Sequence, residues 1–286
     1  MGFLLVEHMN RLEKSVQDSL AAGRKQLVAY IVAGDPAPDW TIVAMHALVE
    51  AGVDVIELGV PFTDPEAEGP VIQGGHERAL THGVTLKKTL AMVQNFRERD
   101  DQTPVLLMGY LNPIEAMGLP EFAVAAKDVG VDGTIIVNLP PEESGELGPV
   151  FEQHGISPVF LLAPTTTDNR AKAVCDAARG FVYYVSLKGT TGSGKLDPVE
   201  VGNKVAHFKT MTDKAVYVGF GIKDAESARL VGSVADGVVM GSSLVEDMGR
   251  LAQSAPSGEK QQMQALLPIT NRMSAIRAAL DQLSSA

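Results

Sequence analysis

Residues 53–73 read VDVIELGVPFTDPEAEGPVIQ, and this stretch carries the strongest fold signal in the chain. The apolar, β-branched run Val53–Leu58 is too short for a helix and is typical of a strand buried in a parallel sheet. Glu57 lies inside that run, where an ionised side chain is costly unless it has a partner or a chemical task. A loop with three further carboxylates, Asp64, Glu66 and Glu68, follows. At the C-terminal end of a barrel strand this pattern predicts a catalytic group, and a structural carboxylate held by backbone N–H groups is the alternative.

The composition limits the possible functions. The chain has 286 residues, a net charge of −11 and a single cysteine, Cys175. Because no excess of cations is available to neutralise phosphates or anionic lipids, we expect neither nucleic-acid binding nor docking on a membrane. One cysteine excludes an intrachain disulfide and a multi-cysteine metal site, and no metal is expected. No apolar run is long enough to cross a bilayer and no signal-peptide pattern follows Met1–Val6, so we expect a cytoplasmic protein.

Short β-rich runs alternate with helical segments along the whole length. This alternation requires a parallel sheet with right-handed crossovers, and eight runs favour an α/β fold of the (β/α)8 TIM-barrel type over a doubly wound sheet. We therefore expect residues 1–286 to form one TIM-barrel domain. The eight runs are Gln26–Ala33, Val53–Leu58, Pro104–Tyr110, Asp132–Asn138, Ser157–Leu162, Phe181–Ser186, Ala215–Phe220 and Ala235–Met240.

Two apolar stripes predict helices outside this repeat. One stripe predicts an extra N-terminal helix that covers the bottom of the barrel, and the other predicts a C-terminal helix. Their members are Met9, Leu12, Val16 and Leu20, and then Ile269, Met273, Ile276 and Leu280.

Three other loops follow predicted strands and have specialised compositions. Residues 187–195, rich in Gly and Thr, predict a mobile lid or an anion-binding loop, with a merely flexible connection as the alternative. The turns 219–221 and 241–243, reading GFG and GSS, follow the seventh and eighth strands. Barrels often build a phosphate site from backbone amides at these two positions, and tight turns without a ligand are the alternative. The six histidines show no ligand spacing, and we interpret them as surface or packing residues.

Seven ordered motifs in this chain resemble those of the tryptophan synthase alpha subunit family. The resemblance extends from the N-terminal helix to the last strand and beyond. The motifs are AGDP at 33–36, ELGVPFTDP at 57–65, GPVIQ at 69–73, GYLNP at 109–113, LPPEE at 139–143, YYVS at 183–186 and GFGI at 219–222.

The resemblance implies a (β/α)8 barrel that cleaves indole-3-glycerol phosphate to indole and glyceraldehyde 3-phosphate. It implies no cofactor in this chain, and a partner β subunit that carries pyridoxal phosphate and consumes the indole in an α2β2 assembly. Glu57 would be the acid/base catalyst, and Glu68 would be the second catalytic carboxylate, where the family typically has Asp. The implied indole pocket comprises Tyr30, Ile135, Leu161, Tyr183 and Phe220. The implied phosphate site comprises Gly192, Gly219, Gly221, Gly241 and Ser242. Asp64, Pro65 and Thr191 belong to the implied lid loops, with Thr191 facing the second carboxylate.

Several positions depart from the family pattern. Besides the longer Glu68, these are Glu66 in place of an apolar residue, Asn138 in place of Asp, Val32 in place of Thr, Thr190 in place of Val and Lys223 in place of Ser. The charge type of the catalytic pair survives, which favours a working lyase. Two alternatives stay open: a catalytically weak alpha-like subunit that mainly activates its partner, and another phosphate-binding barrel isomerase or lyase.

Overall fold

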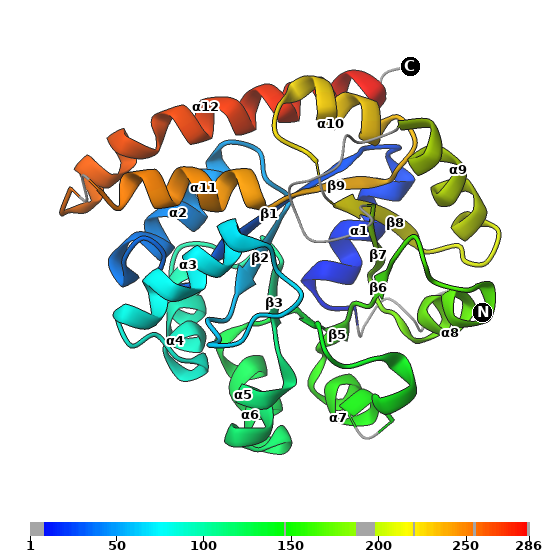
Figure 1. Cartoon of the computed structure of the whole chain (residues 1–286), viewed down its shortest axis with the longest axis horizontal. Coiled ribbons are helices and arrows are strands. Elements are labelled where there is room, and N and C mark those ends of the chain that lie inside the picture. Colours follow the sequence, from blue (N-terminus) through cyan, green and yellow to red (C-terminus); the bar gives the residue numbers. More distant parts are fainter. Residues whose placement is uncertain (1–8, 146, 187–197, 220, 254–255, 285–286) are drawn as a thin grey trace.

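The computed structural model describes residues 9–145, 147–186, 198–219, 221–253 and 256–284. In these ranges, parallel strands form one sheet that curls around a central axis, and most of the helices surround it (Figure 1). The predicted α/β fold of the TIM-barrel type is confirmed. The strands are β1 (Gln26–Val32), β2 (Val55–Gly59), β3 (Val105–Gly109), β4 (Gly133–Ile136), β5 (Ser157–Pro158), β6 (Leu161–Leu162), β7 (Phe181–Val185), β8 (Ala215–Gly219) and β9 (Gly237–Met240).

The fifth predicted strand is divided in two, and this division is where the barrel closes. The sheet order is β5-β4-β3-β2-β1-β9-β8-β7-β6, so the two halves of one short segment occupy its two ends. The intervening residues bridge them: Val159 N–H donates to the Thr134 carbonyl at 2.9 Å, and Tyr183 N–H donates to the Phe160 carbonyl at 3.2 Å. One segment therefore pairs with β4 on one side and β7 on the other.

Alternate strand residues point into the barrel, where they meet the N-terminal helix α1 (Arg11–Ala21). Asn10 caps this helix by accepting the Glu13 N–H at 3.0 Å. Leu12 and Val16 are buried in the cluster formed by the inward-facing strand residues, so α1 covers the bottom as predicted. Leu20 was predicted to share this stripe, but it is 42% exposed. In the same turn Ser19 is the buried residue, and its hydroxyl accepts a hydrogen bond from the Gln26 side chain at 2.9 Å.

The remaining helices surround the sheet. The C-terminal helix is confirmed: its four predicted apolar residues are buried, and it runs along the outside past α10 and α11 (Figure 1). Within the described ranges, none of the helices combines the length and the apolar character that a bilayer crossing requires. Their bounds are α2 (Pro38–Glu50), α3 (Pro70–Thr81), α4 (Leu86–Arg97), α5 (Leu111–Met117), α6 (Leu119–Val129), η2 (Pro141–Glu143), α7 (Leu147–His154), α8 (Asp168–Ala177), α9 (Pro198–Lys209), α10 (Ala225–Gly232), α11 (Ser242–Leu251) and α12 (Glu259–Ser284).

Candidate active site

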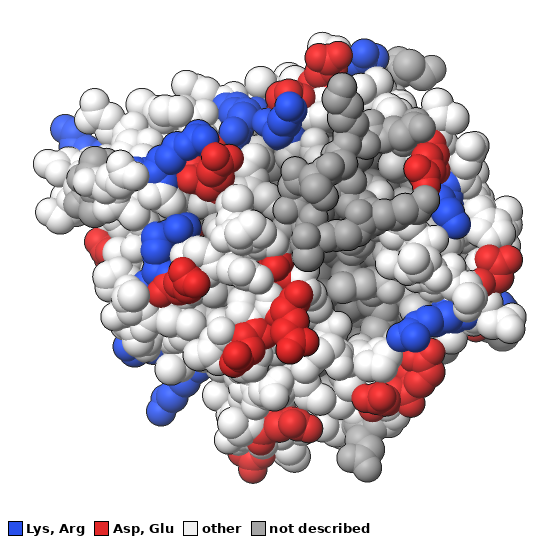
Figure 2. All heavy atoms as spheres, in the orientation of Figure 1, with Lys and Arg blue, Asp and Glu red and all other residues white. Residues whose placement is uncertain are grey.

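A cavity of about 1060 Å³ opens at the C-terminal ends of the strands. Side chains of β1, β2, β7 and β9 form its walls, and the loop between β2 and α3 lies beside it. Figure 2 shows acidic side chains gathered over this loop, whose carboxylates are Asp64, Glu66 and Glu68. In a barrel of this type, the face where these strands end is where active sites are found.

Glu57 reaches this cavity because β2 alternates. Val55 and Glu57 point inward, while Ile56 and Leu58 pack against the surrounding helices. The Glu57 side chain is buried, and its Oε2 has no hydrogen-bond partner among the described residues. Burial, with a further contribution from the charge of Glu68, raises the pKa of Glu57 to about 8. A structural carboxylate would have its oxygens satisfied, so this geometry argues against the structural alternative.

Glu68 lies in the same cavity, immediately before α3, and is also buried. It accepts a hydrogen bond from the Tyr110 hydroxyl, which in turn accepts the Ala67 N–H at 3.0 Å. The Tyr110 ring stacks on Phe62 with centroids 4.9 Å apart. Burial raises the pKa of Glu68, and the hydrogen bond from Tyr110 opposes that rise. The longer side chain therefore has a defined position in the cavity.

A tyrosine and a histidine add a second hydrogen-bonded pair. Tyr30 lines the cavity, and its hydroxyl lies 3.3 Å from Nε2 of His76 on α3. His76 is buried, and Phe62 N–H donates to its Nδ1 at 3.1 Å. His76 is thus a buried packing residue, as the sequence interpretation allows, and its hydrogen bond to Tyr30 is what the sequence did not predict. Its position on the buried stripe of α3, with Ile72 and Ala79, is the only sequence signal that could have singled it out.

The other predicted site residues fall into three groups. Leu161, Tyr183, Gly221, Gly241 and Ser242 line the cavity. Ile135 and Gly219 do not: Ile135 is packed in the barrel core, and the phenol of Tyr183 lies against Gly219, where an added Cβ would be 2.3 Å from its hydroxyl. Asp64 is exposed on the β2–α3 loop and Pro65 beside it is buried. Thr191, Gly192 and Phe220 lie outside the described residues, as does Thr190.

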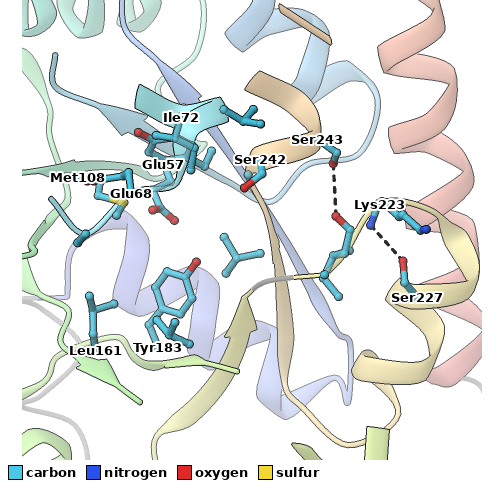
Figure 3. Close-up of a pocket in the computed structure, with 18 of the residues that line it drawn as sticks. Glu57, Glu68, Ile72, Met108, Leu161, Tyr183, Lys223, Ser227, Ser242 and Ser243 are labelled. Atoms are coloured by element: carbon cyan, nitrogen blue, oxygen red, sulfur yellow. Dashed lines mark hydrogen bonds between the residues drawn. The ribbon is translucent and has the colours of Figure 1, made fainter. Parts of the chain in front are cut away.

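The end of the cavity formed by β8, β9 and the helices after them is suited to an anion. α11 begins at Ser242, and no side chain of the described residues caps its first N–H groups. By contrast, Asp224 and Ser227 form a capping box at the start of α10. The Asp224 carboxylate there would repel an anion. The uncapped amides of α11 therefore offer the more favourable anion site. Figure 3 shows Glu57 and Glu68 beside Met108, with Ser243 and Lys223 toward the opposite side.

The remaining departures from the family pattern have ordinary structural surroundings. Asn138 accepts the Leu111 N–H at 2.8 Å and donates to Asn112 Oδ1 at 3.3 Å, so it joins the end of β4 to the first turn of α5. Val32 is buried in the core, and Lys223 is exposed at the rim of the cavity. The described residues contain no group of three or more His, Cys, Asp or Glu side chains placed to hold a metal ion.

Known proteins resemble this one along nearly the whole chain. The sequence profile of the family described as "Tryptophan synthase alpha chain" matches residues 16–275. The tryptophan synthase alpha chain of Marinobacter nauticus is 52% identical over 276 residues, covering 96% of this chain and all of that protein. The crystal structure of tryptophan synthase subunit alpha from Legionella pneumophila superposes with a TM-score of 0.87 at 41% identity, covering 96% of this chain and 99% of that one.

A structure of an assembled complex is also similar. The X-ray structure of the tryptophan synthase complex from Pyrococcus furiosus contains a chain that matches with a TM-score of 0.76 at 35% identity. The match covers 88% of this chain and 98% of that one.

Proposed function

Because the chain belongs to the tryptophan synthase alpha chain family and is a lyase of tryptophan synthesis, we propose that it cleaves indole-3-glycerol phosphate to indole and glyceraldehyde 3-phosphate. One observation carries this proposal: two buried carboxylates and an uncapped helix N-terminus share one cavity. The carboxylates suit proton transfer to and from the indole end of the substrate. The α11 amides suit its phosphate.

The two carboxyl groups have different tasks in this reaction. Protonated Glu57 donates a proton to C3 of the indole, and the C3–C1′ bond then breaks, with its electron pair restoring the aromatic ring. The hydroxyl on C1′ becomes the aldehyde and returns its proton to Glu57, so the carboxyl group ends as it began. Glu68, ionised, accepts a hydrogen bond from the indole N–H while positive charge develops there. The raised pKa of Glu57 and the opposing effect of Tyr110 at Glu68 favour this assignment.

The rest of the substrate site follows from the cavity and the family resemblance. We assign the indole pocket to Tyr30, Leu161 and Tyr183, and the phosphate to Gly221, Gly241 and Ser242, all of which line the cavity. Phe220, Thr191 and Gly192 keep the roles that the resemblance implies, whereas Ile135 and Gly219 do not line the cavity and are left out of this assignment. The proposal includes no cofactor in this chain.

We further propose that a β subunit carrying pyridoxal phosphate docks over the mouth of the barrel, in an α2β2 assembly, and receives the indole. The similarity to a chain of the Pyrococcus furiosus tryptophan synthase complex supports a partner. The exposed Asp64 on the β2–α3 loop is placed where such a partner would reach it. A partner that prefers one loop conformation would raise turnover only by its differential affinity for that conformation.

An indole-release assay tests the function. The purified chain is mixed with indole-3-glycerol phosphate, alone and with a β subunit, and indole is quantified. We expect measurable release by the chain alone and faster release with the partner. Absence of indole under both conditions would refute the lyase assignment. Release only in the presence of β would favour the weak, partner-activating subunit.

A further inference from the structure

Tyr30 and His76 form a hydrogen-bonded unit whose proton positions are fixed by the backbone. The Phe62 N–H donates to Nδ1 of His76 at 3.1 Å, so that nitrogen carries no proton. Burial lowers the pKa of His76 to about 4, and the imidazole is therefore neutral at physiological pH. A neutral ring with an accepting Nδ1 has its proton on Nε2. His76 consequently donates to the Tyr30 hydroxyl oxygen, 3.3 Å away.

The Tyr30 hydroxyl proton is then free to be donated elsewhere, and a buried acceptor in the same cavity lacks a partner among the described residues. Tyr30 on β1 is the register neighbour of Glu57 on β2, and both side chains line the cavity. The phenol lies over Gly59, the next inward position of β2 after Glu57, and it fits there because Gly59 has no side chain: a Cβ would be 2.4 Å from the Tyr30 hydroxyl. In the part of the chain that the structure describes, Glu57 Oε2 is buried without a partner, whereas Glu68 already accepts from Tyr110.

We propose that the Tyr30 hydroxyl, oriented by His76, donates a hydrogen bond to the carboxylate of Glu57 when Glu57 has given up its proton. This inference rests on the proposed function, in which Glu57 is the acid/base group. Tyr30 is then a positioning residue rather than only a wall of the indole pocket, and His76 acts through Tyr30.

The consequence concerns the balance between the two forms of Glu57. The titratable groups that face it are Glu68 from the β2–α3 loop, Tyr30 from β1 and Tyr183 from β7. Burial and the negative charge of Glu68 both disfavour the ionised form. A hydrogen bond from Tyr30 favours it, since bonds to charged groups are stronger than bonds to neutral ones. The phenol thereby limits how far the Glu57 pKa rises and keeps the proton transferable.

Infrared titration of the purified chain tests the proposal without substrate. The carboxylic acid band of Glu57 is identified as the band lost in Glu57→Gln, and its pH dependence is followed. In Tyr30→Phe we expect this band to persist to higher pH, with a pKa raised by about one unit. The alkaline limb of the plot of kcat against pH should move to higher pH by the same amount. His76→Leu should produce part of this shift alone and no further shift in the Tyr30→Phe background.

Tyr184→Phe is the matched control. It removes a buried hydroxyl from the outward face of β7, where Tyr184 packs against Phe208, and should leave the Glu57 band unchanged. An unchanged Glu57 titration in Tyr30→Phe would overturn the proposal. So would a shift confined to the band lost in Glu68→Gln, which would place the phenol on Glu68 instead. Because the titration needs no substrate, failure of the lyase assignment would be recognised separately, in the indole-release assay.

Discussion

Glu57 combines deep burial with an oxygen that has no partner among the described residues, and this makes its proton both costly to lose and chemically available. In Glu57→Gln the amide keeps the shape but has no transferable proton. We expect kcat to fall by about 10²–10⁴, the range typical of general acid–base catalysis, with a smaller change in KM. Steady-state kinetics of indole release measure this, and near-normal turnover by the folded variant would contradict the role.

The pH dependence of turnover follows from the same pair of carboxyl groups. The active form has Glu57 protonated and Glu68 ionised, so activity should fall as pH rises through about 8, the pKa of Glu57. It should also fall as pH drops through the raised pKa of Glu68. Burial at Glu57 affects stability as well. Its folded-state pKa exceeds the ordinary value of 4.5, so the folded protein binds more protons than the unfolded chain, and stability is lost as pH rises from 4.5 to about 8.

Replacing Glu57 by Gln removes that titration. We therefore expect Glu57→Gln to be more stable than the parent at pH 9, by a few kcal/mol, and to show little difference at pH 4. Urea unfolding at both pH values measures the free energy of unfolding. Equal stabilities at pH 9 would mean that Glu57 is not buried as described.

Variants of Glu68 test whether its methylene, additional to the family's usual Asp, is tolerated or required. Tyr110 holds the longer side chain in the cavity, so Glu68→Ala should reduce kcat by at least a hundredfold, the scale of one lost electrostatic contact to developing charge. Glu68→Asp should retain substantial activity, because it keeps the charge. Indole release measures both variants. An active Glu68→Ala would transfer the role to Glu66 or Asp64 on the same loop.

At the scale of the element, the first turn of α11 differs from that of α10 in how it is capped. Gly241 precedes the helix without a side chain, and among the described residues no side chain caps the first N–H groups of α11. α10 differs only in that Asp224 and Ser227 cap each other. We therefore expect an anion to bind at the start of α11 rather than at the start of α10.

Gly241→Ala is the sharpest test of the phosphate end. An added Cβ would be 3.5 Å from Tyr30, an ordinary contact, so the fold should persist. The methyl group would nevertheless occupy the space in which a phosphate approaches the amides. We expect affinity for glycerol phosphate to fall about tenfold or more while the unfolding midpoint changes little, as measured by calorimetric titration. Ser233→Ala, at the C-terminal end of α10, is a control that should bind normally. Equal binding of glycerol and glycerol phosphate by the parent chain would contradict the site itself.

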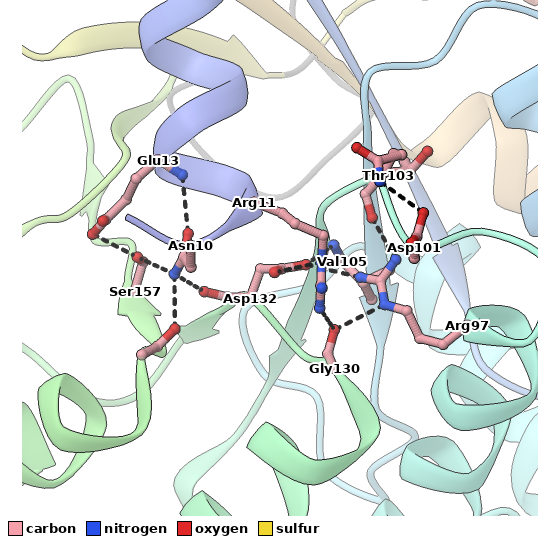
Figure 4. A network of polar contacts seen from close by, with 12 residues as sticks. Asn10, Arg11, Glu13, Arg97, Asp101, Thr103, Val105, Gly130, Asp132 and Ser157 are labelled. Atoms are coloured by element: carbon pink, nitrogen blue, oxygen red, sulfur yellow. Dashed lines mark hydrogen bonds and ion pairs between the residues drawn. The ribbon is translucent and has the colours of Figure 1, made fainter. Parts of the chain in front are cut away.

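At the scale of the whole molecule, the barrel end opposite the cavity is closed by a polar network (Figure 4). Asp132 accepts the Val105 N–H at 2.8 Å and pairs with Arg97 at 2.8 Å and Arg11 at 3.0 Å. Asn10 donates to the Asp132 carbonyl at 2.8 Å. The network therefore joins α1 to β3 and β4 far from the proposed chemistry, where such contacts serve stability.

Asp132→Ala should destabilise the fold by about 3–5 kcal/mol, because removing one partner of a buried ion pair leaves the other charge uncompensated. Asp176→Ala, which breaks the exposed pair with Lys172 at 3.1 Å, should change stability by less than about 1 kcal/mol. Chemical unfolding of the two variants compares them directly. Similar effects would mean that the network contributes no more than a surface ion pair.

The strand order, the inward position of Glu57 and the apolar stripe of α12 could all be predicted from the sequence. Each depends on local periodicity: strands alternate with period two, and helices repeat near 3.6 residues, so a short window already shows which side chains are buried. The turn at Gly241 could be predicted for a similar reason, because its place after the last strand follows from counting the repeats. The identity of the reactants came from the family motifs, because hydrophobic periodicity carries no information about a substrate.

Only the tertiary structure decided which side chains meet. His76 and Tyr30 are 46 residues apart in the sequence, and Tyr110 and Glu68 are 42 residues apart. The local sequence around these residues does not predict either hydrogen bond. The same applies to Ile135 and Gly219, which face the barrel interior yet do not line the cavity, since that depends on the layer in which each side chain ends and on what covers it. Closure through the divided fifth strand is likewise a property of the whole sheet. Local sequence specifies conformation, whereas the pKa of Glu57 and the partners of its neighbours arise from long-range packing, because burial and distance exist only once the chain has folded.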